Sequence, residues 1–200
     1  MLLGLDVGGT FTDAVIIDGH RVVATAKRRT TKDNLMNGIG EALDAVLEGY
    51  DTSNIEQVTL STTVVTNTIV EEKEQVVDLY VVTGPGRNVD DIFPVKPIYL
   101  QGYTDHRGIV VEHTPADAVR GIANMVQARS GTDLAAVSAK FGVRNPHEEL
   151  SITEELKNTY HTISNGSLLS GSLNFPRRTI SAYFNSAVTP VFTVFKKNVE

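Results

Sequence analysis

The sequence predicts a mixed α/β fold, and three observations support this class. Three strand-like apolar runs open the chain at 1–7, 13–18 and 21–27, and a tight turn joins the last two. Apolar residues then recur every three or four positions over 33–48, which indicates an amphipathic helix. Beyond residue 114, helical and strand-like segments alternate, as they do in α/β proteins.

Composition limits the classes of protein that this chain can represent. Its 200 residues suit one large or two small domains, and 41% hydrophobic residues suffice for a core. The net charge of −6 argues against general binding to nucleic acid or to anionic membranes. The chain contains no cysteine, which excludes disulfides and thiol catalysis and fits a reducing compartment. No apolar run resembles a secretory signal or approaches the roughly 20 residues of a membrane span, so we expect a soluble, cytoplasmic protein.

The first loop combines an acid, two glycines and two hydroxyls within seven residues. Asp6 ends the first strand and would hold Mg²⁺, through water because Mg²⁺ dehydrates reluctantly. Glycines at such a turn permit positive φ and present bare N–H groups to phosphate. The predicted phosphate ligands are Gly8, Gly9, Thr10 and Thr12. The alternative is an ordinary Gly-Gly hairpin with an adjacent aspartate.

A second polar stretch, Ser61–Thr68, follows a predicted strand at 57–61 and leads into a predicted helix at 64–72. A capping-box pattern at 53–56 predicts a helical turn before that strand. The hydroxyls and the amide of this stretch could bind an anion, or they could cap the helix and satisfy the loop backbone. The residues selected for a binding role are Thr62, Thr63, Thr66 and Asn67.

The second half of the chain continues the α/β pattern. Strands are predicted at 76–82, 96–100, 108–112, 133–140 and 161–164, with a polar loop at 166–171. Helices are predicted to start at Thr114-Pro115 and at Asn145-Pro146, and a third runs near 177–190 with an apolar stripe.

Several charged side chains of this half can be explained without a functional role. Acids such as Glu148 and Glu149 favour the first turn of a helix through its dipole and need no catalytic role. His106 and His147 are expected on the surface, because no second ligand has metal-site spacing with His106. Arg178 is either a cation at a helix end or a contact for substrate or phosphate.

Two segments, GLDVGGTFTD and STTVVTNTIVEE, resemble the N-terminal region of the hydantoinase A and 5-oxoprolinase family, part of the actin-like ATPase superfamily. The resemblance implies a ribonuclease H-like lobe with a mixed sheet flanked by helices, plus a small α/β addition. It divides the chain into a core at 1–82, the addition at 83–175 and a helix at 176–200 that leads toward a second lobe. The family usually carries Gly-Phe-Arg-Asp after the strand at 76–82, and this chain does not; Arg87 with Asp90 or Asp91 could take over that role.

The resemblance also implies chemistry. Members use ATP and Mg²⁺ to open cyclic amides such as hydantoin or 5-oxoproline through a phosphorylated lactam, and here Asp6 and Asp13 would act in catalysis. Asp13 is a candidate base or ligand of a metal-bound water, or simply a strand-end residue. The alternatives are a ketone carboxylase subunit, a non-catalytic binding or assembly module, and, less well supported by the second motif, a sugar kinase.

The resemblance covers the first of two lobes, and the second phosphate loop and the adenosine pocket have no counterpart. We therefore expect a fragment, a half-enzyme with a separate partner lobe, or a degenerate domain. The expected partners are nucleotide, a cyclic-amide substrate and the second lobe, with self-association into a homo-oligomer also open.

Overall fold

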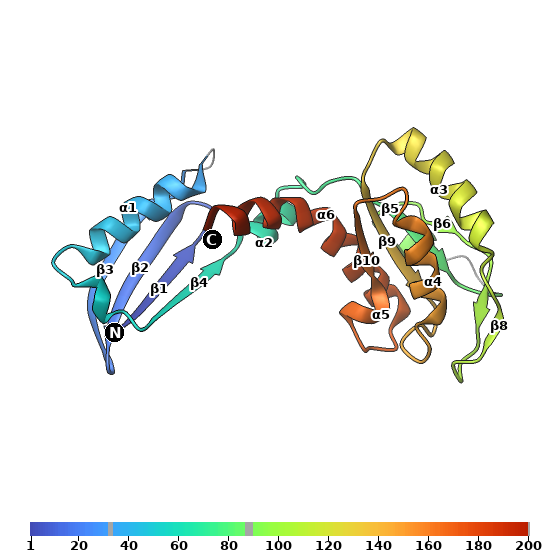
Figure 1. The fold of residues 1–200 in the computed structure, drawn as a ribbon, viewed down its shortest axis with the longest axis horizontal. Helices are drawn as coiled ribbons and strands as arrows, with labels where there is room; N and C mark the ends of the chain where they lie inside the picture. Colours follow the sequence, from blue (N-terminus) through green and yellow to red (C-terminus); the bar gives the residue numbers. More distant parts are fainter. Residues whose placement is uncertain (32–33, 87–89, 200) are drawn as a thin grey trace. The chain divides into compact units, whose positions relative to one another are not determined.

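The computed structural model describes residues 1–31, 34–86 and 90–199. The chain forms two compact units, one comprising 1–73 and 190–200 and the other comprising 74–189. Each unit has its own four-stranded sheet (Figure 1) and its own core, and the second unit also contains a two-stranded sheet of β7 (Tyr103–Thr104) and β8 (Val110–Glu112). The long helix α6 (Phe175–Val199) begins in the second unit and ends in the first. Among the described residues, no helix combines the length and apolar character that crossing a membrane requires.

The first unit is a four-stranded mixed sheet with the strand order β3-β2-β1-β4. Strands β1 to β3 form an antiparallel meander, and β4 lies parallel to β1. The elements are β1 (Leu2–Val7), β2 (Phe11–Asp18), β3 (Arg21–Arg29), α1 (Leu35–Leu47), the short 3₁₀ helix Thr52–Asn54, β4 (Gln57–Thr62) and α2 (Val64–Val70). The predicted mixed α/β fold is confirmed, and so is the predicted order of meander, helix and strand.

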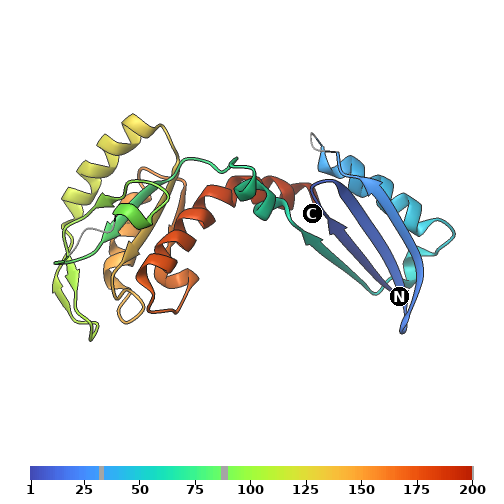
Figure 2. The same ribbon diagram turned by 180° about the vertical axis from the view of Figure 1, so that it is seen from behind.

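Helix α1 covers one face of this sheet (Figure 2). Alternate residues of β1 and β2 point toward it, so Leu3, Leu5 and Ile16 pack against Ala42 and Val46 of the helix. The opposite face, which carries Gly4, Asp6 and Asp13, has no helix of this unit packed against it over β1 to β3 and is partly exposed. This alternation places Asp6 on the open face of the sheet.

The second unit is built on a four-stranded parallel sheet with the order β10-β9-β5-β6. Its elements are β5 (Asp78–Val82), the 3₁₀ turn Asp90–Ile92, β6 (Ile98–Tyr99), β7 (Tyr103–Thr104), β8 (Val110–Glu112), α3 (Ala116–Ser130), β9 (Leu134–Ala139), α4 (His147–Leu156), β10 (Thr162–Asn165), α5 (Gly166–Leu169) and the first part of α6. The family resemblance places the segment of β5 in the core at 1–82. In the structure, β5 pairs with β9 in this second sheet.

Both faces of the parallel sheet are buried. Tyr80 and Val82 of β5 face a core that includes residues of α3 and α4, whereas Leu79 and Val81 face one that includes α6. A strand covered on both faces needs apolar side chains on both, which explains the unbroken apolar runs of β5 and β9.

Local capping differs from the sequence predictions at three places. The predicted helical turn before β4 is confirmed as Thr52–Asn54, but its cap is Asp51, which accepts from Ser53 N, and not a capping box at 53–56. Pro115 occupies the N-cap of α3, and the buried hydroxyl of Thr114 makes no hydrogen bond within the described part of the chain. The segment 166–171 starts with the helix α5, because the Asn165 side chain accepts from the backbone amides of its first turn.

Candidate functional site

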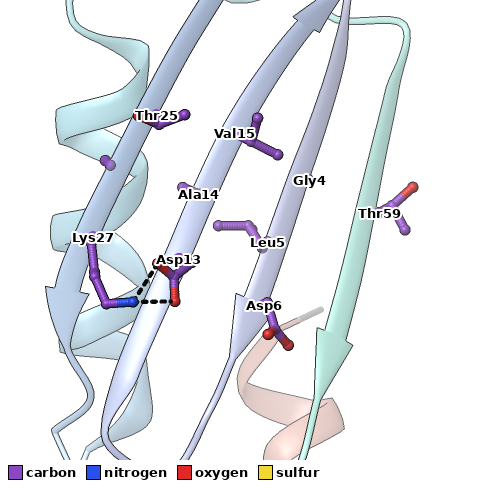
Figure 3. A pocket seen from close by; sticks show the side chains of 10 residues that line it. Gly4, Leu5, Asp6, Asp13, Ala14, Val15, Thr25, Lys27 and Thr59 are labelled. Carbon is purple, nitrogen blue, oxygen red and sulfur yellow. Dashed lines mark hydrogen bonds and ion pairs between the residues drawn. The ribbon is translucent and has the colours of Figure 1, made fainter. Parts of the chain in front are cut away.

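Four polar residues form one row across the open face of the first sheet. The strand registers pair Asp13 with Lys27, Asp6 with Asp13, and Asp6 with Ser61. Directly opposed residues on neighbouring strands lie about 4.5–5.5 Å apart at Cβ, so the row is continuous. Figure 3 shows Lys27, Asp13 and Asp6 side by side in a cavity of about 440 Å³ on this face.

The two aspartates of the row differ in their partners. Lys27 Nζ lies 2.9 Å and 3.2 Å from the two carboxylate oxygens of Asp13. Asp6 accepts a hydrogen bond of 2.6 Å from the Ser61 hydroxyl and forms no ion pair within the described part of the chain. A neutral hydroxyl leaves the negative charge of Asp6 uncompensated. Asp6 is therefore the carboxylate of the row that is suited to hold a cation.

The loop after β1 needs its glycines for close packing. Neither Gly8 nor Gly9 has a positive φ, so the positive φ predicted for these glycines is wrong. A Cβ on Gly9 would lie 2.6 Å from Asn67 Nδ2, and one on Gly8 would lie 3.0 Å from Phe11 O. The second motif of the sequence thus contacts the first through Asn67.

Hydrogen bonds hold this loop from both ends. Gly8 N donates to Phe11 O, and Thr30 donates through its hydroxyl to Gly8 O and through its amide to Thr10 O. The amides of Gly9 and Thr10 donate to no other residue that the structure describes. The loop therefore presents two adjacent N–H groups that remain available to an anion.

The hydroxyls of the predicted site face different ways. Thr12 is fully buried, and its hydroxyl lies 3.1 Å from that of Thr30, so it supports the loop from within. Thr62 donates to Val7 O and accepts from Val64 N. Of its two predicted roles, anion binding and hydrogen bonding to the loop backbone, these contacts match the second. Thr63 accepts from Asn67 Nδ2, whereas Thr66 is exposed.

A cavity of about 260 Å³ lies beside the loop and α2. Its lining residues are Val7, Gly8, Gly9, Thr30, Leu35, Thr62, Val64, Asn67, Thr68, Glu71, Lys73 and Val191. The structure thus brings together Gly8, Gly9, Thr62 and Asn67 of the predicted site. Thr10, Thr63 and Thr66 do not line this cavity, and Asp6 and Asp13 line the one on the open face.

Sequence reasoning missed Thr30 and Lys73. Thr30 follows β3 with no motif around it, and only the pairing of β3 with β2 carries it to the loop. Lys73 supplies the cationic side chain of the smaller cavity and pairs with Glu71. In the sequence, Lys73 directly follows the acidic pair Glu71 and Glu72, so the net charge of this segment is negative and does not indicate a basic site.

The polar residues considered after β5, together with His106, have different surroundings. Arg87 lies outside the described residues; Asp90 accepts from the Tyr99 hydroxyl, and Asp91 is exposed. His106 is exposed as predicted.

Arg178 corrects both predicted alternatives. It is fully buried in the first turn of α6, where a helix dipole disfavours a cation, and it donates to the carbonyl oxygens of Ser172 and Ala139. Burial lowers the pKa of this guanidinium, and the charge of Glu149 opposes that shift. Arg178 is a structural residue that ties the start of α6 to the end of β9.

The hydantoinase/oxoprolinase N-terminal region model matches residues 2–160, which is more than half of the chain. The chain belongs to this family. Among curated protein sequences, none matches the chain significantly.

Two solved structures share the fold of this hydantoinase/oxoprolinase region over almost the whole chain. An acetone carboxylase, described as catalysing ATP-dependent acetone carboxylation and solved free of nucleotide, matches with 17% identity and a TM-score of 0.74, covering 99% of this chain and 34% of that one. The ATP-dependent caprolactamase of Pseudomonas jessenii matches with 18% identity and a TM-score of 0.71, covering 100% of this chain and 33% of that one. The chain spans about a third of the length of each.

Proposed function

We propose that the chain is the N-terminal lobe of an ATP-dependent hydrolase that opens cyclic amides. The observation that carries this proposal is the uncompensated carboxylate of Asp6, which stands next to a glycine loop with two available amides. A carboxylate and bare amides at the end of a strand suit a magnesium–phosphate complex. Membership of the hydantoinase/oxoprolinase family supports the same assignment.

Asp6 holds Mg²⁺, through water, in this proposal. The hydrogen bond from Ser61 to one carboxylate oxygen of Asp6 orients the group and leaves the other oxygen available. Asp13 is a weaker choice for a base or a ligand of metal-bound water, because Lys27 already neutralises its charge. Its proposed role is to fix the row of side chains beside Asp6.

The loop binds the phosphate groups through the amides of Gly9 and Thr10, and Lys73, which pairs with Glu71, lines the neighbouring cavity. The buried Thr12 hydroxyl and Asn67 hold the loop in place and are positioning residues. Thr62 and Thr63 order the start of α2 beside it. The arrangement contributes positioning and charge neutralisation, which dominate phosphoryl transfer.

Bound ATP would supply a phosphoryl group to the amide oxygen of the ring, which makes the ring carbon electrophilic toward water. The remaining site, including the adenosine pocket, is proposed to come from a second lobe. A self-associated form of the chain is a further proposal for the assembly.

A cysteine-free chain suits a reducing compartment, and we place the protein in the cytoplasm.

A ketone carboxylase is the second candidate function, because the fold likeness to acetone carboxylase equals the likeness to the caprolactamase. Both reactions would use the same loop and metal ligand. Phosphate release measured in parallel with hydantoin, 5-oxoproline, caprolactam and acetone with bicarbonate separates the two. A chain that releases phosphate with none of them when its second lobe is present would be a non-catalytic binding or assembly module.

The substitution Asp6→Asn tests the proposed metal role in the complete enzyme. We expect the Mg²⁺ concentration for half-maximal phosphate release to rise about 10- to 100-fold, the loss that follows when a partner of a bound metal is removed. Asp18→Asn is the matched control, because Asp18 is exposed at the far end of β2. Unchanged Mg²⁺ dependence in Asp6→Asn with the control behaving as the parent would refute the assignment of Asp6.

A further inference from the structure

The second unit contains a cluster of three metal-ligating side chains where α3 and α4 pack together. His113 lies just before α3, and His147 and Glu148 are the first two residues of α4. They come from segments that are far apart in the sequence. The packing of the two helices alone brings them together, which explains why sequence spacing gave no sign of a site.

Both imidazoles of the cluster approach the same carboxylate oxygen. His113 Nδ1 lies 2.7 Å and His147 Nδ1 lies 3.3 Å from Glu148 Oε1. The two rings stand edge to face with their centroids 5.4 Å apart. All three potential ligand atoms lie within 4.8 Å of one another. Three potential ligand atoms this close to one another can bind a single ion.

Glu148 is anchored and charged. Only 2% of its side chain is exposed, and its other oxygen accepts from Thr114 N at 2.8 Å. No lysine or arginine pairs with Glu148 among the residues that the structure describes. Glu148 therefore offers an ordered carboxylate oxygen that has two imidazoles beside it and no lysine or arginine partner, and a cation can join it there.

The donor set and the spacing select the kind of cation. Two imidazole nitrogens and one carboxylate oxygen form a ligand set that Zn²⁺ accepts, with a fourth position for water or another donor. Ligand atoms about 2.0–2.1 Å from a tetrahedral ion lie about 3.3 Å apart. The distance from His147 Nδ1 to Glu148 Oε1 already has this value, and His113 Nδ1 would have to move about 0.6 Å away from the same oxygen. The imidazoles are 69% and 59% exposed, which leaves solvent access for the ion.

We propose that His113, His147 and Glu148 form a zinc site at the joint of α3 and α4. Thr114 N orients the carboxylate from the second side, as groups behind a metal ligand do. The ion stabilises the joint by replacing two hydrogen bonds to one oxygen with three coordinate bonds. Because both histidines are exposed, the fourth ligand is water or a donor from a bound molecule.

The test is zinc binding by the full chain after removal of metal with a chelator. We expect one equivalent of Zn²⁺ in a competition titration with a chromogenic chelator, and a visible spectrum typical of tetrahedral coordination when Co²⁺ replaces Zn²⁺. His113→Gln and His147→Gln should each weaken zinc binding more than about 100-fold, since loss of a direct ligand exceeds the 10- to 100-fold effect of a second-sphere change. His106→Gln is the matched control, because His106 is an exposed histidine outside the cluster.

Two further readouts keep the proposal falsifiable. Zinc should raise the Tm of the parent chain and of His106→Gln, and should leave the Tm of His113→Gln unchanged. The proposal fails if the parent chain binds no zinc at micromolar concentration, or if the two cluster variants bind it as tightly as the parent. The site lies in the second unit and Asp6 lies in the first, so this outcome is independent of the Mg²⁺ dependence in Asp6→Asn.

Discussion

At the scale of single residues, the role open to a side chain depends more on its hydrogen-bond and ion-pair partners than on its residue type. Asp6 and Asp13 are both aspartates on one face of neighbouring strands, yet Lys27 pairs with one of them and a hydroxyl pairs with the other. In the loop, a Cβ on Gly8 would crowd Phe11 O and one on Gly9 would crowd Asn67, so close contacts and not backbone conformation explain the two glycines. Glu148 is likewise more than a first-turn acid, because two imidazoles and an amide converge on it.

The contact between Gly9 and Asn67 gives a prediction at this scale. In Gly9→Ala, the new methyl group would overlap the end of the Asn67 side chain, which must move away from Thr63 to make room, so we expect the free energy of unfolding to fall by about 0.5–1.5 kcal/mol. Adding Asn67→Ala removes the obstacle and should recover at least half of that loss. Urea unfolding followed by circular dichroism measures both, and the double-mutant cycle gives the coupling.

Gly40→Ala is the matched control for this prediction. Gly40 lies within α1, and a Cβ there meets nothing within 4 Å, so alanine should stabilise the chain by about 0.4–1 kcal/mol. If Gly9→Ala matches Gly40→Ala, the packing of the two motifs against each other is not a constraint.

At the scale of elements, two buried charges join four elements of the second unit. Glu149 of α4 accepts from Ala139 N at the end of β9 and from Ser167 N in α5, each at 2.7 Å. Arg178 of α6 donates to Ala139 O. A single residue of β9 is therefore held by an anion on one side and a cation on the other, which fixes where the strand ends.

The buried position of Arg178 predicts a large loss of stability on substitution. Arg178→Met leaves the charge of Glu149 without its buried counter-charge and leaves Ala139 O without its donor, so the free energy of unfolding should fall by about 3–5 kcal/mol. Arg177→Met is the neighbouring control, because Arg177 is exposed and its loss should cost less than about 0.5 kcal/mol. Equal thermal stability of the two variants would show that Arg178 does not link these elements.

At the scale of the whole molecule, each candidate site lies within one unit. The glycine loop, both cavities described above and Asp6 belong to the first unit, whereas the histidine cluster belongs to the second. The chain spans about a third of the acetone carboxylase and of the caprolactamase whose fold it shares. The proposed ATP chemistry therefore concerns an assembly larger than these residues.

This scale predicts weak nucleotide binding by the chain alone. The cavity beside the loop measures about 260 Å³, below the 300–1,000 Å³ or so that small-molecule sites usually offer. We expect isothermal titration with Mg-ATP to give a Kd above about 1 mM, and addition of a second lobe to tighten it. Micromolar binding by the isolated chain that persists in Asp6→Asn would contradict both the weak binding and the assigned loop.

The sequence by itself determined the α/β class, the order of the longer strands and helices, and the family. These features depend on apolar periodicity and on two motifs that are continuous in the chain, so they can be read along it. It also selected Gly8, Gly9 and Asn67, which the structure brings together.

Only the tertiary structure decided which side chains are partners. Strand register assigned Lys27 to Asp13 and left Asp6 uncompensated, and helix packing assembled His113 with His147 and Glu148. Burial identified Arg178 as a structural residue, where the sequence offered a helix-end cation or a contact for substrate or phosphate. The physical reason is that charge compensation and desolvation depend on distances between residues far apart in sequence, and local patterns contain no information about those distances.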